Sequence, residues 1–148
     1  MAIEILSKNN RKSKKIKEHE ACEILYNNPQ ELHIYNVGKI MPSQRRAGQY
    51  YCFVDFRMED GTTFGISYSF NRNNDKYFCG ASSKLYNLMG GFMGLNPLND
   101  TAFKFEDVDD IEQVLLHKLF FASIKIVNIG GKAYPYIVCE RVIEWKTE

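Results

Sequence analysis

The sequence predicts a mainly β fold: a small barrel of five strands, with a helix between the third and fourth strands and a basic arm at the N-terminus. Its 9 tyrosines and 10 phenylalanines among 148 residues favour strands. Apolar residues alternate with polar or small ones in the segments 31–41, 50–70 and 119–145, as in half-buried strands. The last two segments contain an Asp-Gly and a Gly-Gly pair, which favour hairpin turns. A chain of this length suits one domain with its own core.

Residues 1–28 are predicted to form the arm, and residues 29–148 the barrel domain. The arm holds the basic run KNNRKSKKIK and then EHEACEILYNN, which is long enough for two turns of helix before Pro29 ends it. We find no hydrophobic period typical of a core-facing helix in the arm. Three roles stay open for it: a solvated tail, an electrostatic tether for phosphates, and a segment that docks on a neighbouring copy.

The first three strands are predicted in ELHIYNVGKIM and in the hairpin 50–70, which turns at Asp60-Gly61. Between them lies the basic loop PSQRRAGQ, with Arg45 and Arg46 at its tip. The two-residue period of strands separates the hairpin's side chains by face. One face is expected to hold Cys52, Val54 and Phe56, and the other Tyr51, Phe53, Asp55 and Arg57. The return strand is expected to send to a common face Phe64, Ile66, Tyr68 and Phe70.

The helix is predicted after Ser82 or Ser83, either of which can cap it, and glycines close it. Its apolar residues stand at helical spacing: Leu85, Leu88, Met89 and Phe92. A second short helix is predicted in DIEQVLL. The final hairpin turns at Gly130-Gly131 and is expected to contribute to the core Ile124, Ile126, Tyr136, Val138 and Val142. Strand, hairpin, helix, hairpin is the order of an OB-fold, whereas an immunoglobulin-like sandwich needs about seven strands and no central helix.

Several classes of function lack their sequence signatures. No apolar run approaches the roughly 18 to 20 residues that span a bilayer, and the N-terminus lacks the apolar core of a secretion signal, so we expect a cytoplasmic protein without a membrane partner. The four cysteines are widely spaced, so no metal, cofactor or disulfide is expected, and Cys52 and Cys139 are interpreted as core residues. His19, His33 and His117 are scattered and no nucleophile motif occurs, so we do not expect an enzyme.

The C-terminal segment DVDDIEQVLLHKLFFASIKIVNIGGKAYPYIVCERV resembles the last third of OB-fold single-stranded DNA-binding proteins of phages and conjugative plasmids of Gram-positive bacteria, the PrgE-like proteins. An acidic and apolar lead-in, a strand, a Gly-Lys turn and a Y-P-x-I strand carry the resemblance, which extends loosely over residues 31–143. The matching residues are Leu119, Phe121, Ile124, Gly131, Lys132, Tyr134, Pro135 and Ile137. The resemblance implies a sequence-independent single-stranded DNA-binding protein of a mobile element, acting in conjugation or phage replication.

Binding of single strands without sequence preference requires cations that follow the phosphates and flat rings that accept any base. Both are found on the outward side predicted for the first three strands and in the loops beside it. The candidate nucleic-acid-binding residues, for DNA or RNA, are Tyr35, Lys39, Arg45, Arg46, Tyr51, Phe53, Arg57, Tyr68, Arg72, Lys76, Lys132 and Tyr134. Among the rings, Phe53 and Tyr68 fit the core of a barrel equally well. Lys132 and Tyr134, in the last turn, would extend the groove.

The net charge of +1 is the sum of separate basic and acidic segments. The basic arm of one copy and the acidic segment of the next would allow self-association along a strand. The candidate residues for it are Lys12, Lys14, Lys15, Asp107, Asp109 and Asp110. The same three aspartates also suit the solvated start of a helix. A second function stays open, in which the ring-rich face of an OB-like module binds, and so inhibits or recruits, a host protein.

Overall fold

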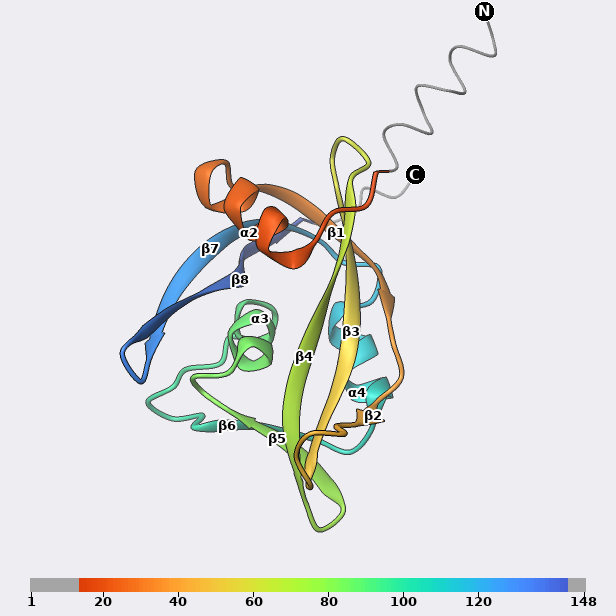
Figure 1. Ribbon diagram of the computed structural model, residues 1–148, viewed down its shortest axis with the longest axis vertical. Helices are drawn as coiled ribbons and strands as arrows, with labels where there is room; N and C mark the ends of the chain where they lie inside the picture. Colours follow the sequence, from red (N-terminus) through yellow and green to blue (C-terminus); the bar gives the residue numbers. More distant parts are fainter. Residues whose placement is uncertain (1–13, 144–148) are drawn as a thin grey trace, which may run out of the picture.

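The computed structural model describes residues 14–143, and within them one antiparallel sheet of eight strands packs against three helices (Figure 1). The elements in chain order are α2 (Glu18–Asn27), β1 (Gln30–Val37), β2 (Met41–Pro42), β3 (Gln49–Met58), β4 (Thr63–Asn73), β5 (Lys76–Gly80), α3 (Lys84–Met93), β6 (Ala102–Phe105), α4 (Val108–Leu115), β7 (Leu119–Ile129) and β8 (Lys132–Ile143). The predicted mainly β fold is therefore confirmed.

The strand order is β6-β5-β4-β3-β1-β7-β8, and the short β2 pairs with β3. The predicted helix is confirmed as α3, after β5 and before β6 and β7. The side-chain oxygen of Ser83 accepts a hydrogen bond from the N–H of Tyr86 at 3.1 Å, and Gly94 ends the helix with a φ of 69°. The predicted barrel of five strands is not confirmed as a closed barrel. Between residues 14 and 143 no pairing joins β8 to β4, β5 or β6, so the sheet is open.

Helix α3 lies between β4 and the β7–β8 hairpin (Figure 1), where the two sides of the sheet would otherwise meet. Its backbone approaches β8 very closely at Gly91, because a Cβ atom at that position would overlap the carbonyl oxygen of Cys139. The approach requires glycine. The helix therefore covers this end of the core and packs between β4 and β8.

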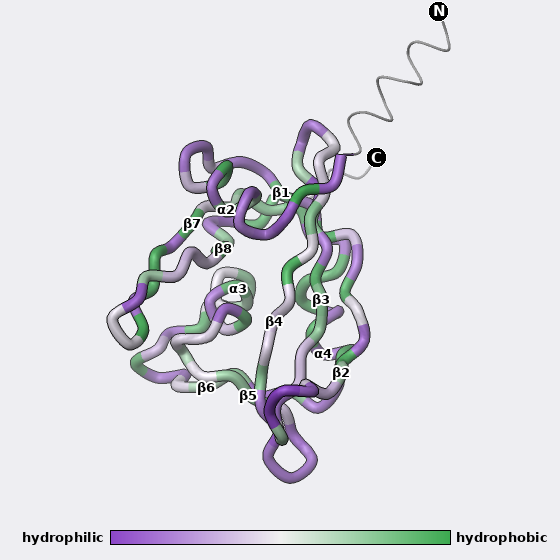
Figure 2. The backbone as a smooth tube through the Cα atoms, in the orientation of Figure 1, coloured by the Kyte–Doolittle hydropathy of each residue, from purple (hydrophilic) through white to green (hydrophobic). Residues whose placement is uncertain are grey.

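The core lies on the inward side of β1, β3 and β4. The predicted alternation in the β3–β4 hairpin is confirmed, since the inward residues are all buried: Cys52, Val54, Phe56, Phe64, Ile66, Tyr68 and Phe70. The rings of Phe56 and Phe64 stack with centroids 5.0 Å apart. Burial of such a side chain stabilises the fold by about 1.5–3 kcal/mol. Figure 2 shows hydrophobic residues along these strands and hydrophilic ones at the hairpin ends.

The segment 14–28 corrects the expectation that the arm lacks a core-facing side. Four of its residues are buried in the core: Ile16, Ala21, Cys22 and Leu25. The N–H of Ile16 donates to the carbonyl oxygen of Thr63 at 2.9 Å, and the N–H of Thr63 donates to that of Lys14 at 2.9 Å. Because α2 offers only three buried positions among ten residues, its apolar stripe is too short to appear as a period in the sequence.

The final hairpin also differs in part from the prediction. Its turn at Gly130-Gly131 is confirmed, with φ of 58° and 84°, and Tyr136 is buried. Ile126 and Val142, expected in the core, are instead 45% and 38% exposed, while Ile124 and Val138 are half-buried. The other buried residues of the hairpin are Phe120, Ala122, Ile137 and Cys139. A register shift between Phe121 and Ala122 breaks the regular alternation of the hairpin, since a shift of one residue exchanges the faces of a strand.

Candidate nucleic-acid interface

Three of the predicted rings lie on the side of β1 and β3 that faces away from the core, which we call the outer face. Phe53 is 47% exposed, and Tyr35 and Tyr51 are half-buried. They alternate with buried residues along their strands. The rings of Tyr51 and Phe53 stand perpendicular, with centroids 5.7 Å apart. Such an edge-to-face pair holds both rings in place while leaving ring surface accessible.

Small residues of β4 leave these rings open on one side. In the β3–β4 register, Tyr51 pairs with Ser69 and Phe53 with Ser67, while Gly65 stands opposite Asp55. A Cβ atom at Gly65 would lie 2.7 Å from a carboxylate oxygen of Asp55, so a larger residue there would require the Asp55 side chain to shift. The result is a shallow cavity of about 650 Å³ over the sheet, lined by Ser43, Arg45, Arg46, Gln49, Tyr51, Phe53, Ser67 and Ser69.

The basic loop lies beside this cavity because local hydrogen bonds fix its path. The side-chain oxygen of Ser43 accepts from the N–H groups of Arg45 and Arg46, at 3.2 and 3.4 Å. At the other end of the loop, Gly48 has a φ of 79°, and its carbonyl oxygen accepts from the N–H of Arg72 at 3.0 Å. Both arginine side chains are exposed. The structure therefore brings the two predicted cations together with Tyr51 and Phe53 on one surface.

A second cationic group stands on the β1 part of the outer face. The guanidinium carbon of Arg57 lies 4.5 Å from the ring centre of Tyr35, so it covers part of that ring. His33 pairs with Arg57 across the strands, and its ring stacks at 6.5 Å on that of His117. Burial, followed by the positive charges of Arg57 and His117, lowers the pKa of His33. Both histidines were missed as site candidates, although the alternation of His33 with Leu32 predicts its outward side.

The prediction that Tyr68 stacks on bases is wrong. This side chain is 1% exposed and belongs to the inward face with Phe64, Ile66 and Phe70, so no base can reach it. Burial raises the pKa of its hydroxyl well above the usual value of 10.0. A strand presents alternate residues to opposite sides, and Tyr68 has the same parity as its buried neighbours.

Three predicted cations lie outside the cavity beside Tyr51 and Phe53. The guanidinium of Arg72 stacks on Tyr77, a core residue, at 4.7 Å, and its Nε donates to the carbonyl oxygen of Asn74. The ammonium of Lys76 lies 4.0 Å from a carboxylate oxygen of Glu106. Lys39 is exposed and follows Gly38, whose N–H donates to the carbonyl oxygen of Phe53 at 2.7 Å.

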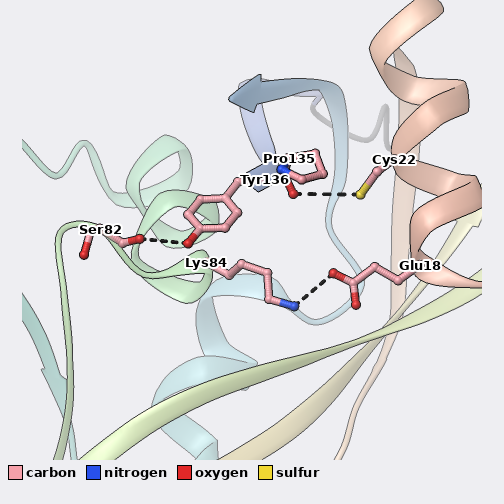
Figure 3. Close-up of polar contacts among 6 residues, drawn as sticks. All are labelled: Glu18, Cys22, Ser82, Lys84, Pro135 and Tyr136. Atoms are coloured by element: carbon pink, nitrogen blue, oxygen red, sulfur yellow. Dashed lines mark hydrogen bonds and ion pairs between the residues drawn. The ribbon is translucent and has the colours of Figure 1, made fainter. Parts of the chain in front are cut away.

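Tyr134 lines a separate cavity of about 740 Å³ between α2, the start of α3 and β8, and Lys132 is exposed near the tip of the same hairpin. Figure 3 shows the polar contacts here. The ammonium of Lys84 lies 2.9 Å from a carboxylate oxygen of Glu18, and the hydroxyl of Tyr136 donates to the carbonyl oxygen of Ser82 at 2.9 Å. Sequence reasoning missed the ion pair, whose members stand 66 residues apart.

No family model, curated protein or solved structure matches this chain. Function is therefore inferred from the described side chains. Within residues 14–143, no helix is long and apolar enough to cross a membrane, and the same segment holds no group of three or more His, Cys, Asp or Glu residues that could bind a metal. The four cysteines are buried and unpaired, which confirms the core positions of Cys52 and Cys139. Burial raises the pKa of the Cys52 thiol to about 12.

The residues predicted for self-association lie in different settings. Lys12 lies outside the described residues, whereas Lys14 and Lys15 are exposed beside the first residue of β4. The acidic residues form the start of α4, as the helix interpretation predicts. The carboxylate of Asp107 accepts from the N–H of Asp109 at 3.0 Å, and that of Asp110 accepts from the N–H of Glu106 at 2.8 Å. These bonds satisfy N–H groups at the start of the helix.

Proposed function

We propose that this protein binds single-stranded DNA without sequence preference, through bases stacked on Tyr51 and Phe53 and phosphates held by Arg45, Arg46 and Arg57. One observation carries the proposal: an accessible pair of rings and a fixed loop with two arginines line the same cavity. Each stacked base contributes about 1–3 kcal/mol. Each phosphate contact adds a salt dependence with a slope of about 0.7 for single strands.

The arrangement of strands supports this proposal. The order β4-β3-β1-β7-β8, with α3 between β5 and β6, is the strand order of an OB-fold without the pairing that closes it. We propose that the fold is an open variant of the OB-fold. Proteins of that fold bind oligonucleotides on the outward face of their second and third strands, which correspond here to β3 and β4. The resemblance of the C-terminal segment extends the proposal to a cytoplasmic protein of a conjugative plasmid or phage.

We further propose that copies associate along the bound strand through the basic arm. Lys14 and Lys15 are exposed where the arm reaches the sheet, and the aspartates of α4 offer opposite charge on another copy. Deletion of residues 1–13 together with Lys14→Gln and Lys15→Gln removes the basic charges of the arm and leaves the backbone pairing of Thr63 with residues 14 and 16 in place. In this truncated protein we expect weaker self-association on long DNA, measured by analytical ultracentrifugation, with little change in affinity for a short oligonucleotide. The opposite result contradicts the proposed role of the arm.

The proposal is tested by fluorescence anisotropy with a labelled oligothymidine, the matching RNA and a duplex, each at two salt concentrations. We expect the single strands to bind more tightly than the duplex, and their affinity to fall as salt rises. Failure to bind single strands more tightly than about 100 μM at low salt contradicts the proposal, since that is no better than ordinary nonspecific binding.

One observation favours a second function, that of a protein-binding module. Met41 and Phe53 are exposed apolar residues, and Met41 pairs with Tyr51 across β2 and β3. Aromatic residues and methionine are enriched at protein interfaces. A module of this kind would bind one host protein with an affinity that changes little with salt, whereas DNA binding weakens steeply. The two salt concentrations of the anisotropy experiment therefore separate the two functions.

A further inference from the structure

The edge of β4 that faces away from β3 is open along its middle. β4 pairs with β3 along most of its length, but with β5 only at residues 71–73. The N–H and C=O groups of Thr63 point to this edge, where they bond to Lys14 and Ile16. Backbone direction repeats every second residue along a strand. Three further residues therefore direct their N–H and C=O groups to the same edge: Gly65, Ser67 and Ser69.

Among residues 14–143, these backbone groups make no hydrogen bond to β5, α2 or α3. Ser67 and Ser69 also line the cavities beside this edge. The side chains of Gly65, Ser67 and Ser69 are a hydrogen atom and two hydroxymethyl groups, which leave the backbone approachable. Nucleobase edges carry both donors and acceptors, so any base can bond to such a row of peptide groups without selecting a sequence.

The outer face and the Lys84 site are joined over this edge. The cavity of about 650 Å³ on the outer face shares Gln49, Ser67 and Ser69 with a cavity of about 300 Å³ at the edge of β4. That cavity in turn shares Lys84 and Tyr136 with the cavity of about 740 Å³ between α2 and β8. Three neighbouring cavities that share lining residues therefore follow one another from the basic loop to Tyr134.

Lys84 lies where this path leaves the sheet. Its ammonium is paired with the carboxylate of Glu18, at 2.9 Å, and lies 5.5 Å from the ring centre of Tyr68. Figure 3 shows the contact between the two charged side chains. They are 28% and 37% exposed, so both are partly accessible to solvent ions. A partly exposed ion pair is weak, and a DNA phosphate carries the same charge as a carboxylate.

We propose that a single strand bound on the outer face crosses the edge of β4 and places a phosphate on Lys84, displacing Glu18. The inference rests on the proposed function and adds to it a second cationic contact and an internal competitor. Glu18 thereby lowers the affinity for strands long enough to reach Lys84. DNA strands that are too short to reach beyond Tyr51 and Phe53 do not compete with Glu18 for Lys84.

The experiment compares Glu18→Gln with Glu23→Gln in binding to oligothymidines of about 5 and 16 nucleotides, near the limits of known site sizes. Glu23 lies on the same helix, is exposed, and has no cation pair within the described part of the chain, so both variants change the net charge equally. We expect Glu18→Gln to bind the 16-mer about two- to fivefold more tightly than Glu23→Gln, the range for releasing a partly exposed ion pair. The two variants should bind the 5-mer equally.

A second variant keeps the test decisive if the loss of Glu18 perturbs α2. Lys84→Gln should weaken binding of the 16-mer and reduce the slope of its salt dependence by about 0.7. In the Lys84→Gln background, Glu18→Gln should bring no gain. Thermal melting of each variant verifies that it is folded.

The outcomes separate the two proposals. If wild-type protein binds neither oligonucleotide, the proposed function fails, and this inference with it. If the 16-mer binds, but Glu18→Gln and Glu23→Gln behave alike, or Lys84→Gln leaves affinity and salt slope unchanged, the path over β4 is wrong while the proposed function stands.

Discussion

The two faces of the β3–β4 hairpin carry similar aromatic residues in opposite environments. On the inward face, the rings of Phe56, Phe64 and Tyr68 are buried and hold the sheet to its core. On the outer face, Phe53 is about half exposed and pairs edge to face with Tyr51 beside two arginines. The comparison teaches that the parity of a ring along its strand, rather than its residue type, decides whether the ring is buried in the core or exposed on the outer face.

The largest effect should come from a ring on the inward face. We expect Phe56→Ala to lower the free energy of unfolding by about 3–5 kcal/mol, because it removes a fully buried ring that packs on Phe64 and Phe120. Urea denaturation measures the change. The outer-face variant Phe53→Ala is the matched control and should change stability much less. Equal losses of stability in both variants would remove the distinction between the faces.

The second prediction concerns DNA binding, which a ring on the outer face should affect more than a ring in the core. Phe53→Ala should weaken binding of an oligothymidine by about 1–3 kcal/mol, because a stacking surface is lost, whereas Phe53→Tyr keeps the ring and should bind nearly as wild type. Anisotropy titrations at one low salt concentration measure both. Wild-type affinity in the alanine variant would show that Phe53 takes no part in binding.

A smaller effect is expected from the cations of the outer face. Replacement of both Arg45 and Arg46 by glutamine should reduce the slope of the salt dependence by about 1.4, since two phosphate contacts at about 0.7 each are lost. The control is Lys104→Gln and Lys125→Gln together, which changes the net charge equally at exposed positions away from the 650 Å³ cavity. Equal slopes in both double variants would argue against a phosphate site at the loop.

The smallest expected effect is on the pH dependence of stability. The pKa of His33 is lowered from 6.5 in the folded protein by burial, Arg57 and His117. Well above pH 6.5 the residue is neutral in both the folded and the unfolded state and contributes no pH dependence. Below it, the unfolded chain binds a proton first, so stability falls with pH until the folded-state pKa is passed. In His33→Gln this part of the acid destabilisation should disappear from melting temperatures measured between pH 5 and 8; an unchanged profile would contradict it.

The fold was predictable where local sequence decides the structure. The turn at Asp60-Gly61 and the cap at Ser83 depend on neighbouring residues alone, and the alternation in β3 and β4 follows from the period of strands. The register shift near Ala122 depends on how two distant strands pair. The burial of Ile16 depends on the position of β4. Neither the register shift nor the burial of Ile16 produces a pattern in the local sequence.

The candidate site was predictable to a similar extent. Arg45, Arg46, Tyr51 and Phe53 lie together because they are close in sequence and on one face. Tyr68 was open to both interpretations, although its parity already grouped it with buried residues. The pairing of Lys84 with Glu18 joins the starts of two helices and could not be foreseen, because it exists only once the sheet brings those helices together.

The most direct test of base stacking on the outer face uses tryptophan fluorescence. The chain has a single tryptophan, at position 145, so a Phe53→Trp, Trp145→Phe variant carries its only tryptophan on the outer face. Upon titration with oligothymidine, we predict quenching of this fluorescence that saturates at the same concentration as the anisotropy of the labelled DNA. DNA that binds by anisotropy but leaves the fluorescence unchanged would contradict the stacking of bases on this face.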